Sequence, residues 1–68
     1  MKTTIGKQIY QLRTERNISQ AKLATHIGVT QKAVDFWEKG INEPKASFIV
    51  ALCEFFGVSA DFILGMED

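Results

Sequence analysis

The sequence predicts an all-α domain of five short helices. Apolar residues recur at helical spacing along most of the chain, and no segment alternates apolar and polar residues as a half-buried strand does. One junction pattern, a Ser or Thr between apolar residues at the N′ and N4 positions of a helix, occurs three times. Glycines follow three of the predicted helices, where glycine commonly ends a helix: Gly28, Gly40 and Gly57.

Length and composition fit one small domain over residues 1–68. A chain of 68 residues, 46% apolar and 24% charged, is long enough for one hydrophobic core only. No apolar run approaches the roughly 20 residues of a membrane span and the N-terminus has no signal-peptide core, so we expect a cytoplasmic protein without membrane contact. Cys53 is the single cysteine and with His26 falls short of a metal set, so no disulfide, metal or cofactor is expected.

The first helix is predicted over about residues 5–16. Three apolar residues share one of its faces at i, i+4 and i+7: Ile5, Ile9 and Leu12. Thr3 or Thr4 is available as its N-cap.

The repeated junctions predict the starts of three further helices near Gln20, Gln31 and Ala60. The junctions are Ile18-Ser19 with Leu23, Val29-Thr30 with Val34, and Val58-Ser59 with Ile63. The third helix should bury Val34 and Trp37 and end at Gly40. After a loop at 41–45, a fourth helix is expected over 46–56 and a short last helix over 60–64. The fourth helix should bury some combination of Phe48, Ile49, Leu52, Phe55 and Phe56.

The zero net charge divides into two opposite halves. Residues 1–34 hold six basic side chains and one acidic one, for a net +5, and residues 35–68 sum to −5. The pI near 6.6 and the overall charge favour an ordinary solvated surface. A polyanionic partner stays possible if one face gathers the basic residues.

Residues 20–40 combine two short helices with a turn at 27–29. By spacing alone this could be any helical hairpin, which is a common structure, or the two-helix corner whose second helix can enter a DNA major groove about 12 Å wide. An ordered set of residues extends this pattern along the chain: Ile5-Gly6, Ile9, Leu12-Arg13, Ser19-Gln20, Leu23-Ala24, Ile27-Gly28-Val29-Thr30, Val34, Trp37-Glu38-Lys39-Gly40, Pro44, Leu52, Phe56-Gly57-Val58-Ser59 and Leu64. With these residues, about residues 5–64 resemble the phage Cro/repressor-type helix-turn-helix domain, the xenobiotic-response-element family of bacterial regulators.

This resemblance implies a compact five-helix, lambda-repressor-like DNA-binding domain with the third helix in the major groove. It implies base contacts at the start of that helix, from Thr30, Gln31 and Lys32. Phe36 departs from the polar reader of many members, and could press on a thymine methyl, lie in the core or face a partner. Expected phosphate contacts are Gln20, Lys22, Lys39, Asn42 and Lys45.

Several further positions bear on the expected DNA binding, either by supporting the fold or by opposing phosphate contact. The resemblance implies that Arg13 and Glu38 form a structural ion pair. Asp35 and Glu43 place carboxylates near the expected phosphates, which should weaken binding, and Ala33 is too short to reach a phosphate. Lys22 and Arg16 could each be a phosphate contact or a solvated side chain.

The expected function is that of a sequence-specific transcriptional regulator, a repressor, bound as a homodimer to a palindromic operator in double-stranded DNA. The apolar surplus late in the chain predicts the dimer interface, at Phe55, Phe62, Ile63 and Met66. The alternative is a protein-interaction module of the same fold, such as an antitoxin or a protein that sequesters a regulator. No small-molecule ligand is evident. An enzyme is not expected, because the chain lacks a paired acid and base, an activated nucleophile and a phosphate-binding glycine loop.

Overall fold

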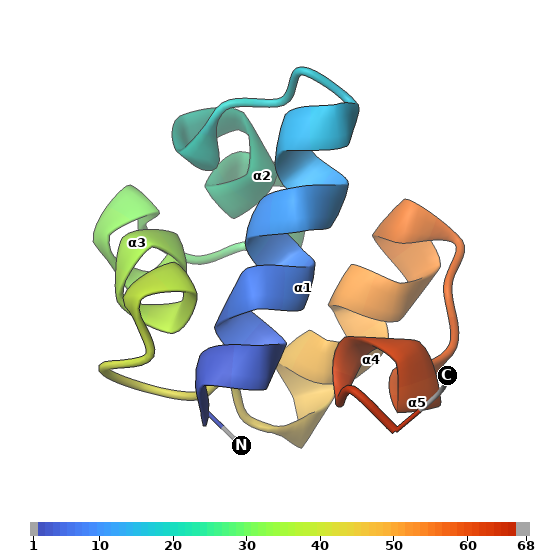
Figure 1. Cartoon of the computed structure of the whole chain (residues 1–68). Coiled ribbons are helices and arrows are strands. Elements are labelled where there is room, and N and C mark those ends of the chain that lie inside the picture. The colour runs from blue at the N-terminus through green and yellow to red at the C-terminus, as the bar shows by residue number, and fades with distance from the viewer. Residues whose placement is uncertain (1, 67–68) are drawn as a thin grey trace.

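The computed structural model describes residues 2–66, with side chains from residue 4 onward. Its helices are α1 (Lys2–Glu15), α2 (Gln20–Ile27), α3 (Gln31–Lys39), α4 (Ala46–Phe56) and α5 (Ala60–Ile63). Figure 1 shows α1 between two pairs of helices, with α2 and α3 on one side and α4 and α5 on the other. No strand occurs in residues 2–66, and the predicted all-α class is confirmed.

The three hydroxyl caps form as the junction pattern predicts. Ser19, Thr30 and Ser59 have extended backbone angles, and their side-chain oxygens accept hydrogen bonds from the backbone N–H groups of Lys22, Ala33 and Phe62. Each bond satisfies one of the N–H groups that a helix start leaves without an intrahelical partner. The start of α4 differs, because its N-cap residue, Lys45, makes no side-chain capping bond.

The predicted first helix is too short at its start. α1 begins at Lys2 and ends at Glu15, so Thr3 and Thr4 lie inside the helix and neither is its N-cap. A Cβ atom on Gly65 would collide with the side chain of Thr4, so the chain after α5 passes directly against this first turn. The added turn has no apolar pattern and packs against a segment near the other end of the chain, which the local pattern could not reveal.

One core joins all five helices. Among the described side chains, this core cluster consists of Ile5, Ile9, Leu12, Leu23, Ala24, Val34, Trp37, Leu52, Phe56 and Ile63. The predicted inward residues of α1 and α3 are all among them. Of the candidates on α4, Leu52 and Phe56 are buried, while Phe48, Ile49 and Phe55 are half-buried at the edge of the core.

Gly6 lets α1 cross α3 at short range. A Cβ atom here would meet the backbone carbonyl of Trp37, and the carbonyl oxygen of Glu38 would lie 2.9 Å away. Because backbone carbonyls cannot turn aside as side chains do, only glycine fits this crossing. The crossing places the end of α3 beside Arg13 of α1, where the polar contacts described below begin.

Candidate nucleic-acid interface

α3 presents a polar surface on the side away from the core. Val34 and Trp37 are buried and hold the helix in place, whereas Thr30, Gln31 and Lys32 are exposed at its N-terminal end. The structure therefore brings the three predicted base-contact residues together on one accessible helix end. Their position relative to one another is fixed by the Thr30 cap and by the burial of the opposite face.

Phe36 continues this surface one turn further along α3. Its side chain is half-buried, so it is not a core residue, and the ammonium of Lys32 lies 5.8 Å from its ring centroid. A lysine over an aromatic face is a favourable cation–π contact that limits the freedom of both side chains. The aromatic ring thus forms an apolar neighbour to the polar helix end.

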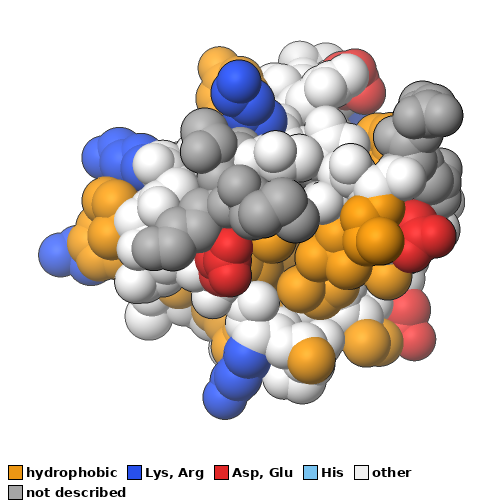
Figure 2. Space-filling model, turned by 60° about the horizontal axis from the view of Figure 1, so that its bottom comes forward, with side chains coloured by type: hydrophobic (Ala, Val, Ile, Leu, Met, Phe, Trp, Pro, Cys, Tyr) orange, Lys and Arg blue, Asp and Glu red, His pale blue; other side chains and the backbone are white. Residues whose placement is uncertain are grey.

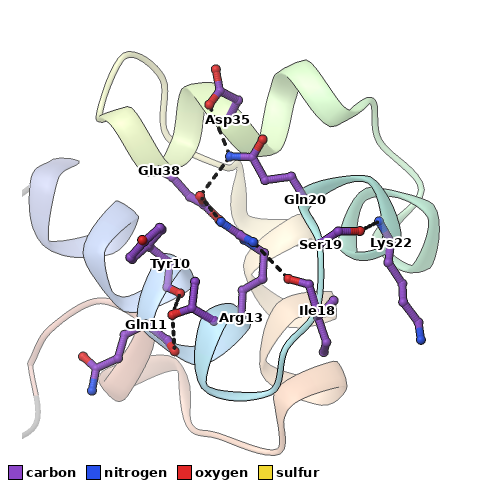
Figure 3. Close-up of polar contacts among 10 residues, drawn as sticks. Tyr10, Gln11, Arg13, Ile18, Ser19, Gln20, Lys22, Asp35 and Glu38 are labelled. Atoms are coloured by element: carbon purple, nitrogen blue, oxygen red, sulfur yellow. Dashed lines mark hydrogen bonds and ion pairs between the residues drawn. The ribbon is translucent and has the colours of Figure 1, made fainter.

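The expected ion pair between Arg13 and Glu38 is present and has two-point geometry. Arg13 Nε donates to Glu38 Oε2 at 2.6 Å, and Arg13 Nη2 donates to Glu38 Oε1 at 2.9 Å. The two side chains are 12% and 6% exposed, so water screens the pair little. Arg13 also donates from Nη1 to the carbonyl oxygen of Ile18, and the pair therefore ties α1, the loop before α2 and the end of α3 together (Figure 3).

The same carboxylate reaches the start of α2. Gln20 Nε2 lies 3.0 Å from Glu38 Oε1 and 3.2 Å from Asp35 Oδ1, so the amide donates to carboxylates on two successive turns of α3 (Figure 3). The hydrogen bond that Arg13 donates to Glu38 raises the pKa of Arg13 further above its usual value, against the opposing effect of burial. The predicted phosphate contact Gln20 is thus placed between the two helices, with its donor group engaged inside the protein.

Asp35 also binds Lys39, another predicted phosphate contact. Lys39 Nζ lies 2.9 Å from Asp35 Oδ2 in an i,i+4 ion pair, and the two side chains are 61% and 30% exposed. The hydrogen bond from Lys39, followed by that from Gln20, holds the pKa of Asp35 below its usual value. Asp35, Gln20, Gln31 and Lys32 line one shallow surface hollow of about 400 Å³.

A second hollow of about 380 Å³ lies between the α2–α3 turn and the start of α4. Its polar residues are Asn42, Glu43 and Lys45, above an apolar floor of Val29, Ala33, Trp37 and Phe48. Lys45 is exposed, and its Nζ lies 5.3 Å from the ring centroid of Phe48. The predicted phosphate contacts Asn42 and Lys45 therefore lie together in this hollow, with the carboxylate of Glu43 beside them.

The two remaining basic residues behave differently from one another. Lys22 is exposed, which is compatible both with a phosphate contact and with a solvated side chain. Arg16 is also exposed, and its guanidinium makes contacts that neither expectation included: it donates to the carbonyl oxygens of Leu12 (3.3 Å) and Phe56 (3.0 Å) and lies over the Phe56 ring. It binds the last turn of α4, where free carbonyls favour a cation. Sequence reasoning missed this role, since 40 residues separate the partners.

Of the four residues predicted at the dimer interface, one is wrong, and the other three stay predictions. Ile63 is wrong, because it has no exposed surface and packs in the core. Phe55 and Phe62 are half-buried, and Met66 is 68% exposed. Figure 2 shows one face of the molecule, where the largest group of apolar side chains lies on the right, the side of α4 and α5 in Figure 1, and smaller apolar groups lie on the left among the basic side chains.

Among the residues that the structure describes, the other side chains that could carry out chemistry do not assemble into a site. Cys53 is half-buried, and burial, with the nearby Glu54 charge, raises the pKa of its thiol, which disfavours the reactive thiolate. Within residues 2–66 no three His, Cys, Asp or Glu side chains are placed to hold a metal ion. In the described part of the chain no helix is long and apolar enough to cross a membrane.

A rigid two-helix corner that exposes the polar end of its second helix defines a helix-turn-helix protein. The family model described as Helix-turn-helix matches residues 9–63, and the chain belongs to this family. The resemblance to Cro/repressor-type domains that the sequence motifs indicated is thereby confirmed.

Known proteins with the same pattern include regulators from bacteria and phages. The chain is 32% identical over 63 residues to the HTH-type transcriptional activator BcrR of Enterococcus faecalis, covering 93% of this chain and 31% of that protein. It is 37% identical over 53 residues to the cryptic phage CTXphi transcriptional repressor RstR of Vibrio cholerae, covering 78% and 48%. The chain thus spans about half or less of the length of these two relatives.

A solved structure matches the whole fold. The P22 c2 repressor, in its crystal structure with synthetic operator 9T and Tl⁺, is 30% identical with a TM-score of 0.87, covering 93% of this chain and 96% of that one. This agreement extends to the arrangement of all the helices and not only to the two-helix corner.

Proposed function

We propose that the chain is a sequence-specific DNA-binding transcriptional regulator that inserts α3 into the major groove. The observation that carries the proposal is the polar end of α3, Thr30-Gln31-Lys32, exposed on a helix whose other side is buried in a repressor-like fold. A glutamine can bond both N6 and N7 of adenine, and a lysine can donate to O6 or N7 of guanine. Phe36 adds an apolar surface suited to a thymine methyl.

Phosphate contacts on both sides of α3 would hold the helix in register. Gln20, Lys22 and Lys39 lie toward α2 and the exposed side of α3, and Asn42 and Lys45 lie before α4. Contacts with the DNA backbone give affinity and orientation but carry no sequence information. In this arrangement the α3 side chains supply the discrimination between sequences.

The size of the molecule favours a homodimer on a palindromic operator. Its longest dimension is 29 Å, less than the roughly 34–36 Å between half-sites one DNA turn apart, so one domain engages one half-site. Two-fold pairing through Phe55, Phe62 and Met66 would use the apolar surface of α4 and α5 and leave α3 free.

We further propose that the regulator represses transcription and acts in the cytoplasm, where bacterial DNA lies. The similar RstR and P22 c2 proteins are named as repressors, and the P22 structure has nearly the same extent as this chain. Proteins of this kind are DNA-binding regulators rather than enzymes.

Selection of bound sites from random duplex DNA, at a stated salt concentration, tests the proposal. An enriched inverted repeat with half-sites one helical turn apart would support both the sequence-specific function and the dimer. Binding without enrichment of any sequence would contradict it.

The second candidate is a protein-interaction module of the same fold. The carboxylates of Asp35 and Glu43 at the proposed interface favour this alternative, because they repel phosphates. The same selection separates the two, since an interaction module would retain no duplex at low salt, where electrostatic binding is strongest.

A further inference from the structure

One carboxylate holds two of the proposed phosphate-binding donors. Asp35 Oδ1 lies 3.2 Å from the Gln20 amide nitrogen, and Asp35 Oδ2 lies 2.9 Å from the Lys39 ammonium. The second acceptor of the Gln20 amide is Glu38, at 3.0 Å. An amide nitrogen has two hydrogens, so both are committed to carboxylates in this structure.

A DNA phosphate would compete for the same hydrogens. Carboxylate and phosphate oxygens are both anionic acceptors, and a hydrogen donated to one is not available to the other. Asp35 is 30% exposed and lines the hollow shared with Gln31 and Lys32, so it lies where DNA would approach. Its own charge would also repel a phosphate at that place.

We propose that Asp35 sets the DNA affinity of this protein, because its carboxylate occupies the Gln20 and Lys39 donors that the DNA backbone would otherwise take. This inference rests on the proposed function. A phosphate must displace Asp35 from the Gln20 amide, whose two hydrogens are both in use, and it must draw the Lys39 ammonium, which keeps further hydrogens, away from the Asp35 charge. Since phosphates are alike in every sequence, Asp35 lowers affinity for all duplexes rather than for particular base pairs.

Glu38 does not share this role. It is held by two hydrogen bonds from Arg13 and its side chain is 6% exposed, so it belongs to the joint between α1 and α3. The contact from Gln20 to Glu38 can persist while the contact to Asp35 is exchanged for a phosphate. Asp35 is therefore the residue of this network whose removal frees donors without loosening the fold.

The test compares Asp35→Asn with Glu54→Gln. Both substitutions remove one negative charge and keep the side-chain shape, and Glu54 is an exposed residue of α4. Affinity is measured on the selected site and on a random duplex of equal length, over a series of salt concentrations. We expect Asp35→Asn to bind both duplexes about three- to fivefold more tightly, the scale of an exposed ion pair, and Glu54→Gln to change affinity less than about twofold.

The salt series supplies a second readout. Release of Lys39 to a phosphate should steepen the dependence of log K on log salt by about 1 in Asp35→Asn. Equal effects of the two variants would overturn the proposal, because net charge alone would then explain them. A loss of affinity confined to the selected site would also overturn it, since that result identifies Asp35 as a base reader.

Lys39→Met, made both in the original protein and together with Asp35→Asn, tests the mechanism directly. In the original protein the substitution removes a phosphate contact that Asp35 weakens, and in the Asp35→Asn background it removes the same contact without that competition, so the loss of affinity should be larger in the Asp35→Asn background, about threefold or more. Equal losses in both backgrounds would show that Asp35 does not hold Lys39 away from DNA. Thermal melting confirms that each variant is folded.

These outcomes are distinct from failure of the proposed function. If neither the original protein nor Asp35→Asn binds any duplex at low salt, DNA binding is wrong and this inference falls with it. If the original protein selects an operator and Asp35→Asn binds no more tightly, only the role of Asp35 is wrong.

Discussion

At the scale of single residues, the two arginines join helices to one another. Arg13 and Glu38 form a two-point ion pair with little exposure, and Arg16 binds the carbonyl that ends α4. Both arginines therefore act on the fold, although an arginine beside a helix-turn-helix could equally serve DNA. The residues left accessible at the start of α3 are a glutamine and a lysine, which suit base edges.

Replacing Gln31 or Lys32 by Ala should cost about 1–3 kcal/mol on the selected site and relax its preference at one base pair. The reason is that each side chain reads a particular base edge. Affinities on the selected site and on single-base variants of it check this. Equal losses on selected and random DNA would show that these residues do not read sequence.

Arg13→Ala should lower the free energy of unfolding by about 2–3 kcal/mol, because Glu38 would lose its two charged hydrogen bonds. A double-mutant cycle with Glu38→Gln in denaturant measures the coupling between the two side chains. Lys7→Ala, at an exposed position of the same helix, is the matched control and should change stability little. Additive effects of the two substitutions would contradict an energetic role for the pair.

At the scale of helices, three starts depend on hydroxyl caps and one crossing depends on the absence of a side chain. The caps at Ser19, Thr30 and Ser59 begin α2, α3 and α5, and are local features. The crossing at Gly6 is different in kind, since α3 carbonyls lie where a Cβ atom would be. It determines how closely α1 approaches α3, and through this distance whether Arg13 reaches Glu38.

Gly6→Ala should destabilise the protein by about 1–3 kcal/mol, the cost typical of an overpacked core. The sign of the stability change separates two effects, because intrinsic helix propensity alone would make the alanine variant more stable by about 1 kcal/mol. Urea denaturation of the variant, beside Lys7→Ala, measures both effects. An increase in stability would show that α1 can shift to admit the methyl group.

At the scale of the whole molecule, the proposed DNA surface and the apolar surface lie on different helices. α3 carries the polar end, and the half-buried aromatic residues Phe55 and Phe62 lie on α4 and α5 with exposed Met66 after them. This separation allows a second copy to pair without covering α3.

Met66→Glu should abolish cooperative binding to an inverted repeat while leaving a folded monomer. A charge at a 68% exposed position costs the fold little but cannot be buried without a partner in an interface. Val50→Glu is the matched control, because Val50 is 57% exposed on α4 and is not among the predicted interface residues. Sedimentation with and without operator measures the assembly, and a strict monomer on a single half-site would contradict the dimer.

The sequence by itself determined the number of helices, three capped starts, the inward residues of α1 and α3, and the helix-turn-helix. These features depend on neighbours within about one helical turn, which a linear pattern contains. Only the tertiary structure decided that Ile63 is buried, that Arg16 binds Phe56, that α1 begins at Lys2, and that Asp35 holds Gln20. Each of these depends on packing between segments that are distant in the sequence, and local periodicity does not encode which segments meet.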